Sequence, residues 1–164
     1  DHGMEWCEDQ IISESTKGDN DVYEQIDEIK LFEKKFADLL SYFESKNIEP
    51  NTIIIEQGND PEGLYFIRSG RVTVTLKSAN NKKMRLKSMG TGTVVGEVSL
   101  YLKAKATASV ISDTACETYF LSHENFEKLN KEDPERAVEL HTYIIKLLSD
   151  RLAKSNATIQ ALMR

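Results

Sequence analysis

The stretch TGTVVGEVSLYLKAKATASV, residues 91–110, is the most informative part of the chain. It holds Gly92 and Gly96, a glutamate directly after the second glycine, and a cluster of small residues near its end. Runs of β-branched residues at both ends predict short strands at residues 93–95 and 107–111. A glycine in such a turn indicates by itself only a backbone position that needs positive φ, so the interpretation depends on the ordered set.

The same strand pattern repeats along the rest of the chain. Runs of β-branched and apolar residues, bounded by turn-forming residues, predict five more strands, at residues 52–56, 64–68, 71–77, 84–88 and 114–121. Ser69 and Gly70 separate two of these runs, which predicts a tight hairpin with Gly70 at positive φ. Short strands at close, regular spacing predict a roll or a barrel.

Helical patterns lie before and after the strands. Between residues 23 and 43, apolar residues recur at steps of three and four, which predicts an amphipathic helix or a broken pair. Ser122 is the predicted N-cap of a short helix that ends near Lys131. Asp133 and Pro134 start a long helix that can run to Leu162. The predicted fold class is mainly β with flanking α: a β-roll with N-terminal helices and a long C-terminal helix.

The order of these residues resembles the cyclic-nucleotide-binding (cNMP/CAP-type) domain of protein kinase A regulatory subunits, bacterial catabolite activators and gated channels. The resemblance runs from about residue 36 to residue 152 and rests on Glu56, Gly58, the run GLYFIRSG (residues 63–70), Val72, Val74, Gly92, Gly96, Glu97, Leu100, Ala108 and Val110. It implies a double-stranded jelly-roll that senses a ligand, with cAMP or cGMP as the candidate, and that carries out no catalysis.

The resemblance also implies how a cyclic nucleotide would be held. Gly96 would allow close approach of the ligand, and Glu97 would accept a hydrogen bond from the ribose 2′-hydroxyl. Backbone amides of Ser99 and Thr107 would bind the phosphate, as in other anion sites at helix N-termini.

One position departs from the family pattern. The arginine that pairs with the cyclic phosphate in the family falls on Ala106 here, and the nearby Lys105 offers a flexible ammonium instead of a planar fork. We therefore expect weakened or lost affinity for cyclic nucleotides. The candidate ligand site consists of Gly96, Glu97, Val98, Ser99, Lys105, Ala106, Thr107 and Ser109.

The opening residues, DHGMEWCEDQII, are similar to the last helix of the STAS domain in bacterial SulP-type anion (sulfate) transporters, some of which carry a cyclic-nucleotide-type domain after it. This implies three parts: the end of a STAS-like helix with its linker (1–21), the roll with its N-terminal helices (22–133), and the long helix (134–164). It also implies a regulatory domain at the cytoplasmic face of the inner membrane, with the rest of a transporter chain as partner. Two alternatives stay open: the sensing domain of a catabolite-activator-type transcription regulator, and an interaction module that binds no ligand.

Composition and residue spacing argue against three other kinds of function or location: nucleic-acid binding, metal binding and a membrane span. The formal net charge is −6, and lysine and arginine are spread along the chain, so no basic stripe for nucleic acid is expected. His123 and His141 have no neighbours at metal-ligand spacing, so no metal site is expected. No apolar run approaches the roughly 20 residues that cross a bilayer, so we expect this stretch itself to be soluble.

The predicted C-terminal helix carries more apolar residues than the roll can cover. Its stripes continue past Leu152 to Ile159 and Leu162, where no strand remains to pack against them. This favours a homodimer through the end of the helix.

Overall fold

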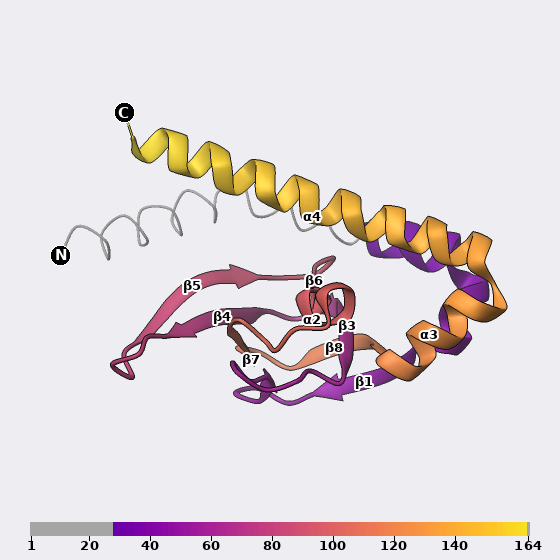
Figure 1. The fold of residues 1–164 in the computed structure, drawn as a ribbon, viewed down its shortest axis with the longest axis horizontal. Helices are drawn as coiled ribbons and strands as arrows, with labels where there is room; N and C mark the ends of the chain where they lie inside the picture. The colour runs from indigo at the N-terminus through magenta and orange to yellow at the C-terminus, as the bar shows by residue number, and fades with distance from the viewer. Residues whose placement is uncertain (1–27, 164) are drawn as a thin grey trace.

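The structure, a computed structural model, describes residues 28–163. Its centre is a β-roll of two four-stranded antiparallel sheets, and helices lie against one side of it (Figure 1). Residues 28–35 are helical and lead into the 3-10 helix η1 (Ala37–Tyr42). The fold class predicted from the sequence is confirmed. The later elements are β1 (Glu44–Ile48), β2 (Ile53–Ile55), β3 (Gly63–Ser69), β4 (Val72–Lys77), β5 (Lys83–Met89), β6 (Val94–Val95), α2 (Glu97–Leu102), β7 (Ser109–Ser112), β8 (Cys116–Ser122), α3 (His123–Glu132) and α4 (Pro134–Leu162).

The pairing of the strands corrects one prediction. One sheet has the order β1-β8-β3-β6 and the other β2-β7-β4-β5, so β3 and β4 lie in different sheets. The hairpin predicted across Ser69 and Gly70 is therefore wrong, because this turn carries the chain from one sheet to the other. Gly70 does have a φ of 100°, and a Cβ there would lie 2.5 Å from the carbonyl oxygen of Ala115.

Strand β1 was not predicted from the sequence. Its residues, ESKNI, are exposed or half-buried and show no run of apolar side chains. Strand β1 pairs with β8 over its whole length, from Glu44 opposite Phe120 to Ile48 opposite Cys116. A distant partner, and not local preference, thus makes this segment a strand.

Alternation along β3 divides the core into two clusters. Leu64 and Phe66 face the helices, where the ring of Phe66 stacks on that of Phe32 at 4.2 Å. Tyr65 and Ile67 face the inside of the roll. Since successive side chains of a strand point to opposite faces, a buried strand can serve both clusters at once. The helices are thereby packed against the outer side of the sheet that holds β3.

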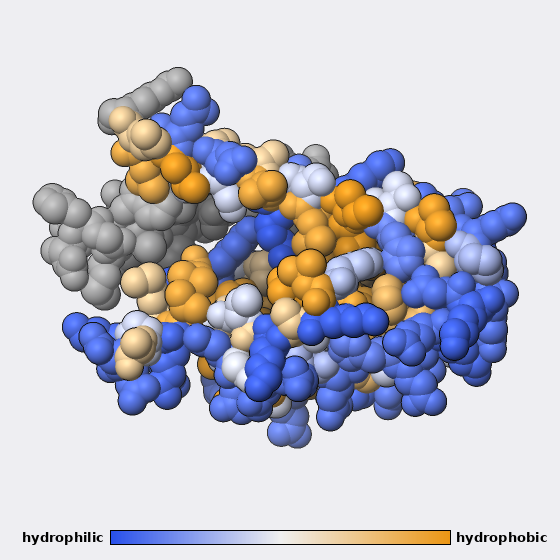
Figure 2. All heavy atoms as spheres, in the orientation of Figure 1, coloured by the Kyte–Doolittle hydropathy of each residue, from blue (hydrophilic) through white to orange (hydrophobic). Residues whose placement is uncertain are grey.

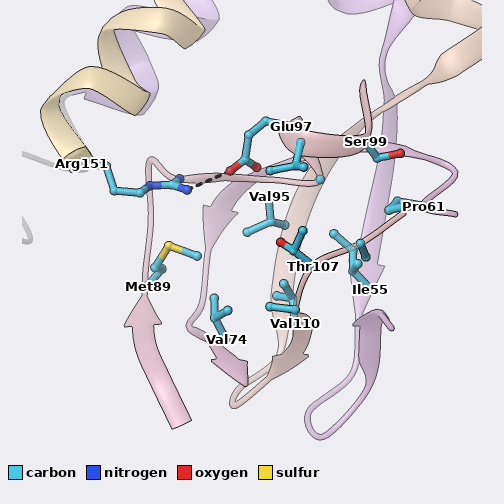
Figure 3. Close-up of a pocket in the computed structure, with 14 residues that line it drawn as sticks. Ile55, Pro61, Val74, Met89, Val95, Glu97, Ser99, Thr107, Val110 and Arg151 are labelled. Atoms are coloured by element: carbon cyan, nitrogen blue, oxygen red, sulfur yellow. Dashed lines mark hydrogen bonds and ion pairs between the residues drawn. The ribbon is translucent and has the colours of Figure 1, made fainter. Parts of the chain in front are cut away.

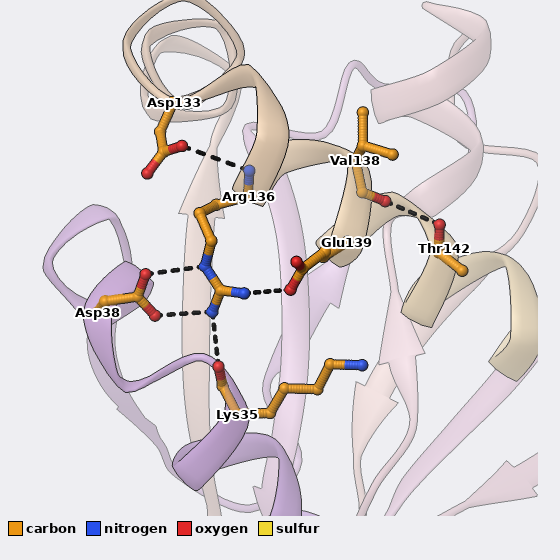
Figure 4. A network of polar contacts seen from close by, with 7 residues as sticks. All are labelled: Lys35, Asp38, Asp133, Arg136, Val138, Glu139 and Thr142. Carbon is orange, nitrogen blue, oxygen red and sulfur yellow. Dashed lines mark hydrogen bonds and ion pairs between the residues drawn. The ribbon is translucent and has the colours of Figure 1, made fainter.

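The start of α4 is fixed to η1 by polar contacts (Figure 4). Asp133 caps the helix by accepting from the backbone N–H of Arg136 at 3.3 Å. The Arg136 guanidinium makes two hydrogen bonds of 2.8 Å to the Asp38 carboxylate and one of 2.6 Å to the Lys35 carbonyl. This bidentate contact holds the pKa of the Asp38 carboxyl below its usual value. The predicted caps at Ser122 and Asp133 are both confirmed.

Only the first half of α4 is buried. Ala137, Leu140 and Ile144 pack in the core, and the rest of the helix runs on across the molecule along one side of the roll, toward the end where the β4–β5 hairpin lies (Figure 1). Figure 2 shows apolar residues along the side of this helix that faces the viewer. The exposed fractions of Leu152, Ile159, Leu162 and Met163 are 62%, 56%, 57% and 82%. Within residues 28–163 no helix is both long enough and apolar enough to span a membrane.

Candidate functional site

A pocket of about 120 Å³ opens between the inner face of the roll, α2 and the middle of α4 (Figure 3). Most of its wall is apolar, because the strands turn Ile55, Val74, Met89, Val95 and Val110 toward it. Polar groups come from α2, from the segment before β7, and from Arg151 on α4. The complete lining is Ile55, Pro61, Val74, Met89, Val95, Gly96, Glu97, Val98, Ser99, Ala106, Thr107, Ala108, Val110 and Arg151.

Gly96 sets the direction in which α2 leaves the sheet. Its φ is 90°, a left-handed conformation that other residues rarely adopt. A Cβ on this residue would lie 2.5 Å from the carbonyl oxygen of Gly63, so a larger residue would displace β3 or α2. The backbone can thus turn sharply enough to place Glu97, Val98 and Ser99 at the pocket.

Glu97 and Arg151 form an ion pair at the pocket (Figure 3). The distance from Arg151 Nη1 to Glu97 Oε1 is 3.1 Å, and the side chains are 24% and 15% exposed. Arg151 Nη2 also donates to the hydroxyl of Thr93 at 2.9 Å and to the carbonyl of Val94 at 2.8 Å. Arg151 therefore joins α4 to β6 and to the first residue of α2. These two side chains are the charged groups in the pocket lining within the described residues, and their charges cancel.

Ala106 lies where the sequence places it, in the pocket wall, and is 9% exposed. Its backbone is already engaged, since its N–H donates to Asn59 at 2.9 Å and its carbonyl accepts from Gly58 at 2.8 Å. The methyl group offers no partner for an anion. The part of the pocket wall that carries Ala106 therefore limits the space of the pocket and offers no charged group to a ligand.

Six of the eight predicted site residues line the pocket: Gly96, Glu97, Val98, Ser99, Ala106 and Thr107. The other two do not. Ser109 lies on the opposite face of β7, where its hydroxyl accepts from the backbone N–H of Gln57 at 2.9 Å. Lys105 is exposed and outside the lining. The interpretation of these eight residues as ligand contacts stays a prediction.

The fold and the pocket agree with a family relationship in the sequence. The family pattern described as Cyclic nucleotide-binding domain matches residues 45–133, which is more than half of the chain. The chain belongs to this family.

Two relatives of this cyclic nucleotide-binding domain are much longer than this chain. Potassium/sodium hyperpolarization-activated cyclic nucleotide-gated channel 2 of Mus musculus is 34% identical over 121 residues, covering 74% of this chain and 13% of the channel. Glutaminase 1 of Bradyrhizobium diazoefficiens is 29% identical over 168 residues, covering 99% of this chain and 26% of that protein. The chain thus spans a small part of either relative. A crystal structure of a cyclic nucleotide-binding domain from Methylobacillus flagellatus has a TM-score of 0.72 at 20% identity, covering 78% of this chain and 72% of that one, and so shows the same fold.

A second contact connects α2 of this cyclic nucleotide-binding domain to the long helix. The Tyr101 hydroxyl lies 2.9 Å from His141 Nδ1, and His141 Nε2 lies 2.8 Å from the side-chain oxygen of Asn130. The ring of Phe126 packs edge-on against Tyr101 and His141. Burial raises the pKa of Tyr101 to about 12 and lowers that of His141, so both groups are neutral at pH 7. The end of α2 is therefore tied to α3 and α4 by neutral hydrogen bonds.

Sequence reasoning did not assign Arg151 to the site. Its position does carry a signal, because it continues the stripe of Leu140, Ile144 and Leu147 by one further step of four. A charged residue that extends a core-facing stripe lies on the helix face that is turned toward the roll, like the apolar residues before it. The carboxylate that receives it lies 54 positions earlier, so only the folded chain identifies Glu97 as its partner.

Proposed function

We propose that this domain is a non-catalytic sensor that binds a ribose-bearing ligand in the pocket at Glu97 and transmits occupancy to α4 through Arg151. The observation that carries the proposal is the ion pair between Glu97 and Arg151 inside the pocket. A ligand that hydrogen-bonds to this carboxylate must share it with the guanidinium or displace it. Ligand binding and the position of α4 are then coupled by one contact.

The pocket's chemistry supports a ribose-bearing ligand with weak recognition of phosphate. A carboxylate accepts hydrogen bonds from sugar hydroxyls, and apolar walls such as Val74, Met89 and Val110 suit a flat ring. Without an arginine at position 106, a cyclic phosphate loses a bidentate, charge-assisted contact. Each of the two hydrogen bonds contributes roughly 1.5–3 kcal/mol, so affinity falls by about two to four orders of magnitude.

The test is isothermal titration calorimetry with cAMP and cGMP on the unchanged chain and on Ala106→Arg. We expect weak binding by the unchanged chain and a gain of about 100-fold or more in the variant. Lys105→Arg is the matched control, because it adds an arginine one residue away on a side chain outside the pocket lining, and it should gain little. Adding Glu97→Ala to Ala106→Arg should remove most of the gain.

Two results would contradict the proposal. Submicromolar binding by the unchanged chain would mean that the pocket needs no arginine at position 106. No gain in Ala106→Arg would mean that the pocket does not take a cyclic nucleotide in this orientation, and the alternative of an interaction module without a ligand would then be favoured. Adenosine, titrated in parallel, reports binding of the nucleoside without its phosphate.

We further propose that the sensor regulates a larger protein to which it is attached. The resemblance of residues 1–12 to the end of a STAS domain supports an anion transporter as that protein. The match to Glutaminase 1 extends over 99% of this chain, including residues before the roll, and supports an enzyme as host instead. A catabolite-activator-type regulator remains the third host. The sequence upstream and downstream of this chain distinguishes them: membrane spans, an enzyme domain, or a DNA-binding unit.

A further inference from the structure

Charge is divided unevenly between two parts of the chain. Residues 1–27 contain nine acidic residues and one lysine. Residues 63–96 contain seven lysine and arginine residues and no carboxylate. The chain as a whole has a net charge of −6, so its one strongly basic stretch belongs to an acidic protein. Opposite charges of this size favour association between the two parts.

The fold places most of these basic residues on one exposed hairpin. Residues 76–87, which include the β4–β5 turn, are all exposed. Lys82 and Lys83 form no ion pair with any other residue in the range 28–163, and Arg85 forms only a 3.9 Å pair with Asp113. The basic residues on the hairpin are Lys77, Lys82, Lys83, Arg85 and Lys87. Five of the 21 lysine and arginine residues of the chain thus lie on this one hairpin.

The hairpin also has apolar and backbone features of a binding surface. Met84 and Leu86 are 63% and 51% exposed, and β5 is the edge strand of its sheet. An exposed edge strand offers free backbone hydrogen-bonding groups to another segment. Residues 1–27 contain Met4, Trp6, Ile11 and Ile12, which are apolar partners for such a surface.

The described chain begins near the end of β5, at the opposite end of this strand from the β4–β5 turn. The Glu28 carboxylate lies 3.5 Å from the position that a Cβ on Gly92 would take, and Gly92 follows the end of β5 by three residues. The seven residues of β5 cover about 24 Å. Twenty-seven residues span about 40 Å as a helix and about 90 Å when extended. Residues 1–27 are therefore long enough to reach every part of the hairpin.

We propose that residues 1–27 bind the β4–β5 hairpin of the same chain as an acidic internal ligand. Covalent attachment at Glu28 gives this segment an effective concentration in the millimolar range, which favours it over acidic partners in solution. Val74 of β4 and Met89 of β5 line the ligand pocket, so the bound segment lies on the strands that form one wall of the pocket. The proposal does not depend on what the pocket binds.

The experiment places a spin label on Cys7 of the full chain and measures amide signals of the hairpin by NMR. The Cys116 thiol is 2% exposed and its pKa is raised by burial, so the label reacts at Cys7. We expect signals of residues 77–87 to lose most of their intensity at 0.1 M salt, where the screening length is about 10 Å, and to recover at 1 M, where it is about 3 Å. Lys82→Glu with Lys83→Glu should restore the signals at low salt.

The matched control reverses two charges on α3, Lys128→Glu with Lys131→Glu, and should leave the broadening unchanged. Full-intensity hairpin signals at low salt overturn the proposal, and so does broadening that Lys82→Glu with Lys83→Glu does not relieve. A mixture of spin-labelled chain without isotopes and isotope-enriched chain without a spin label tests whether the contact forms within one chain or between two chains. If the hairpin signals broaden as much in that mixture as in the spin-labelled, isotope-enriched chain alone, residues 1–27 bind the hairpin of a second copy. This result overturns the proposal that they bind the hairpin of the same chain.

Discussion

The ion pair between Glu97 and Arg151 gives the sharpest test of how α4 is held to the pocket. Arg151→Met keeps the length of the aliphatic stem and removes three hydrogen bonds, to Glu97, Thr93 and the Val94 carbonyl. The side chains of the pair are 24% and 15% exposed, so the contact is neither a surface pair, worth about 0–1 kcal/mol, nor fully buried, where breakage costs about 3–5 kcal/mol. We expect a loss of about 2 kcal/mol in the free energy of unfolding.

A double-mutant cycle isolates the pair from its surroundings. Glu97→Gln, Arg151→Met and the double variant are unfolded in urea and followed by circular dichroism. We expect a coupling energy of about 1–2 kcal/mol, which is within the range found for residues in direct contact. The matched control is the pair of Asp150 and Lys154 on the same helix, 3.1 Å apart, with side chains 66% and 77% exposed. This pair should couple by about 0.5 kcal/mol or less.

The result that would refute this reasoning is a coupling energy for Glu97 and Arg151 no larger than that of Asp150 and Lys154. Such a result would mean that solvent screens the pair and that α4 is held by its apolar contacts alone. It would also remove the contact on which the proposed coupling between ligand and helix depends.

Two further outcomes are expected from the same helix. Burial lowers the pKa of His141 from the ordinary 6.5, so below this pH the unfolded chain binds more protons than the folded chain. The free energy of unfolding should therefore fall as the pH drops below about 6.5. His141→Gln should reduce this pH dependence, measured by urea unfolding between pH 7 and 5. Ending the chain after Leu152 removes the exposed Ile159, Leu162 and Met163 and should abolish self-association in sedimentation equilibrium, whereas an intact chain that is monomeric at high micromolar concentration would contradict the proposed dimer.

The parts of the fold that were predicted correctly depend on local chemistry. The caps at Ser122 and Asp133 act on backbone groups three residues away, and the positive φ at Gly70 is a property of one residue. The errors in the predicted fold concern which strands pair with each other. Strand β1 has no apolar alternation and exists through pairing with β8, about 70 residues later. The turn at Gly70 looks like a hairpin locally, but the two strands pair with β8 and β7 in separate sheets.

In the candidate site, too, the residues placed by local structure were predicted correctly, and the residue whose position depends on its strand face was not. Glu97, Val98 and Ser99 follow Gly96 in one short helix, so placing one of them places all three at the pocket. Ser109 does not line the pocket because strand residues alternate. Val110 faces the pocket, and Ser109 faces the groove beside Gln57. A resemblance that follows sequence order does not by itself state which face of a strand each residue takes.

Arg151 shows why the position of a charge matters more here than its presence. The pocket lacks an arginine at position 106, yet α4 supplies a guanidinium to the same pocket. That guanidinium cannot take the role expected at position 106 while it pairs with Glu97, because three of its five N–H donors are committed to Glu97, Thr93 and Val94. An arginine on the wall would bind a phosphate and leave α4 free. An arginine on α4 holds the helix to the Glu97 carboxylate, so in the proposed function a ligand that takes this carboxylate acts on the helix directly.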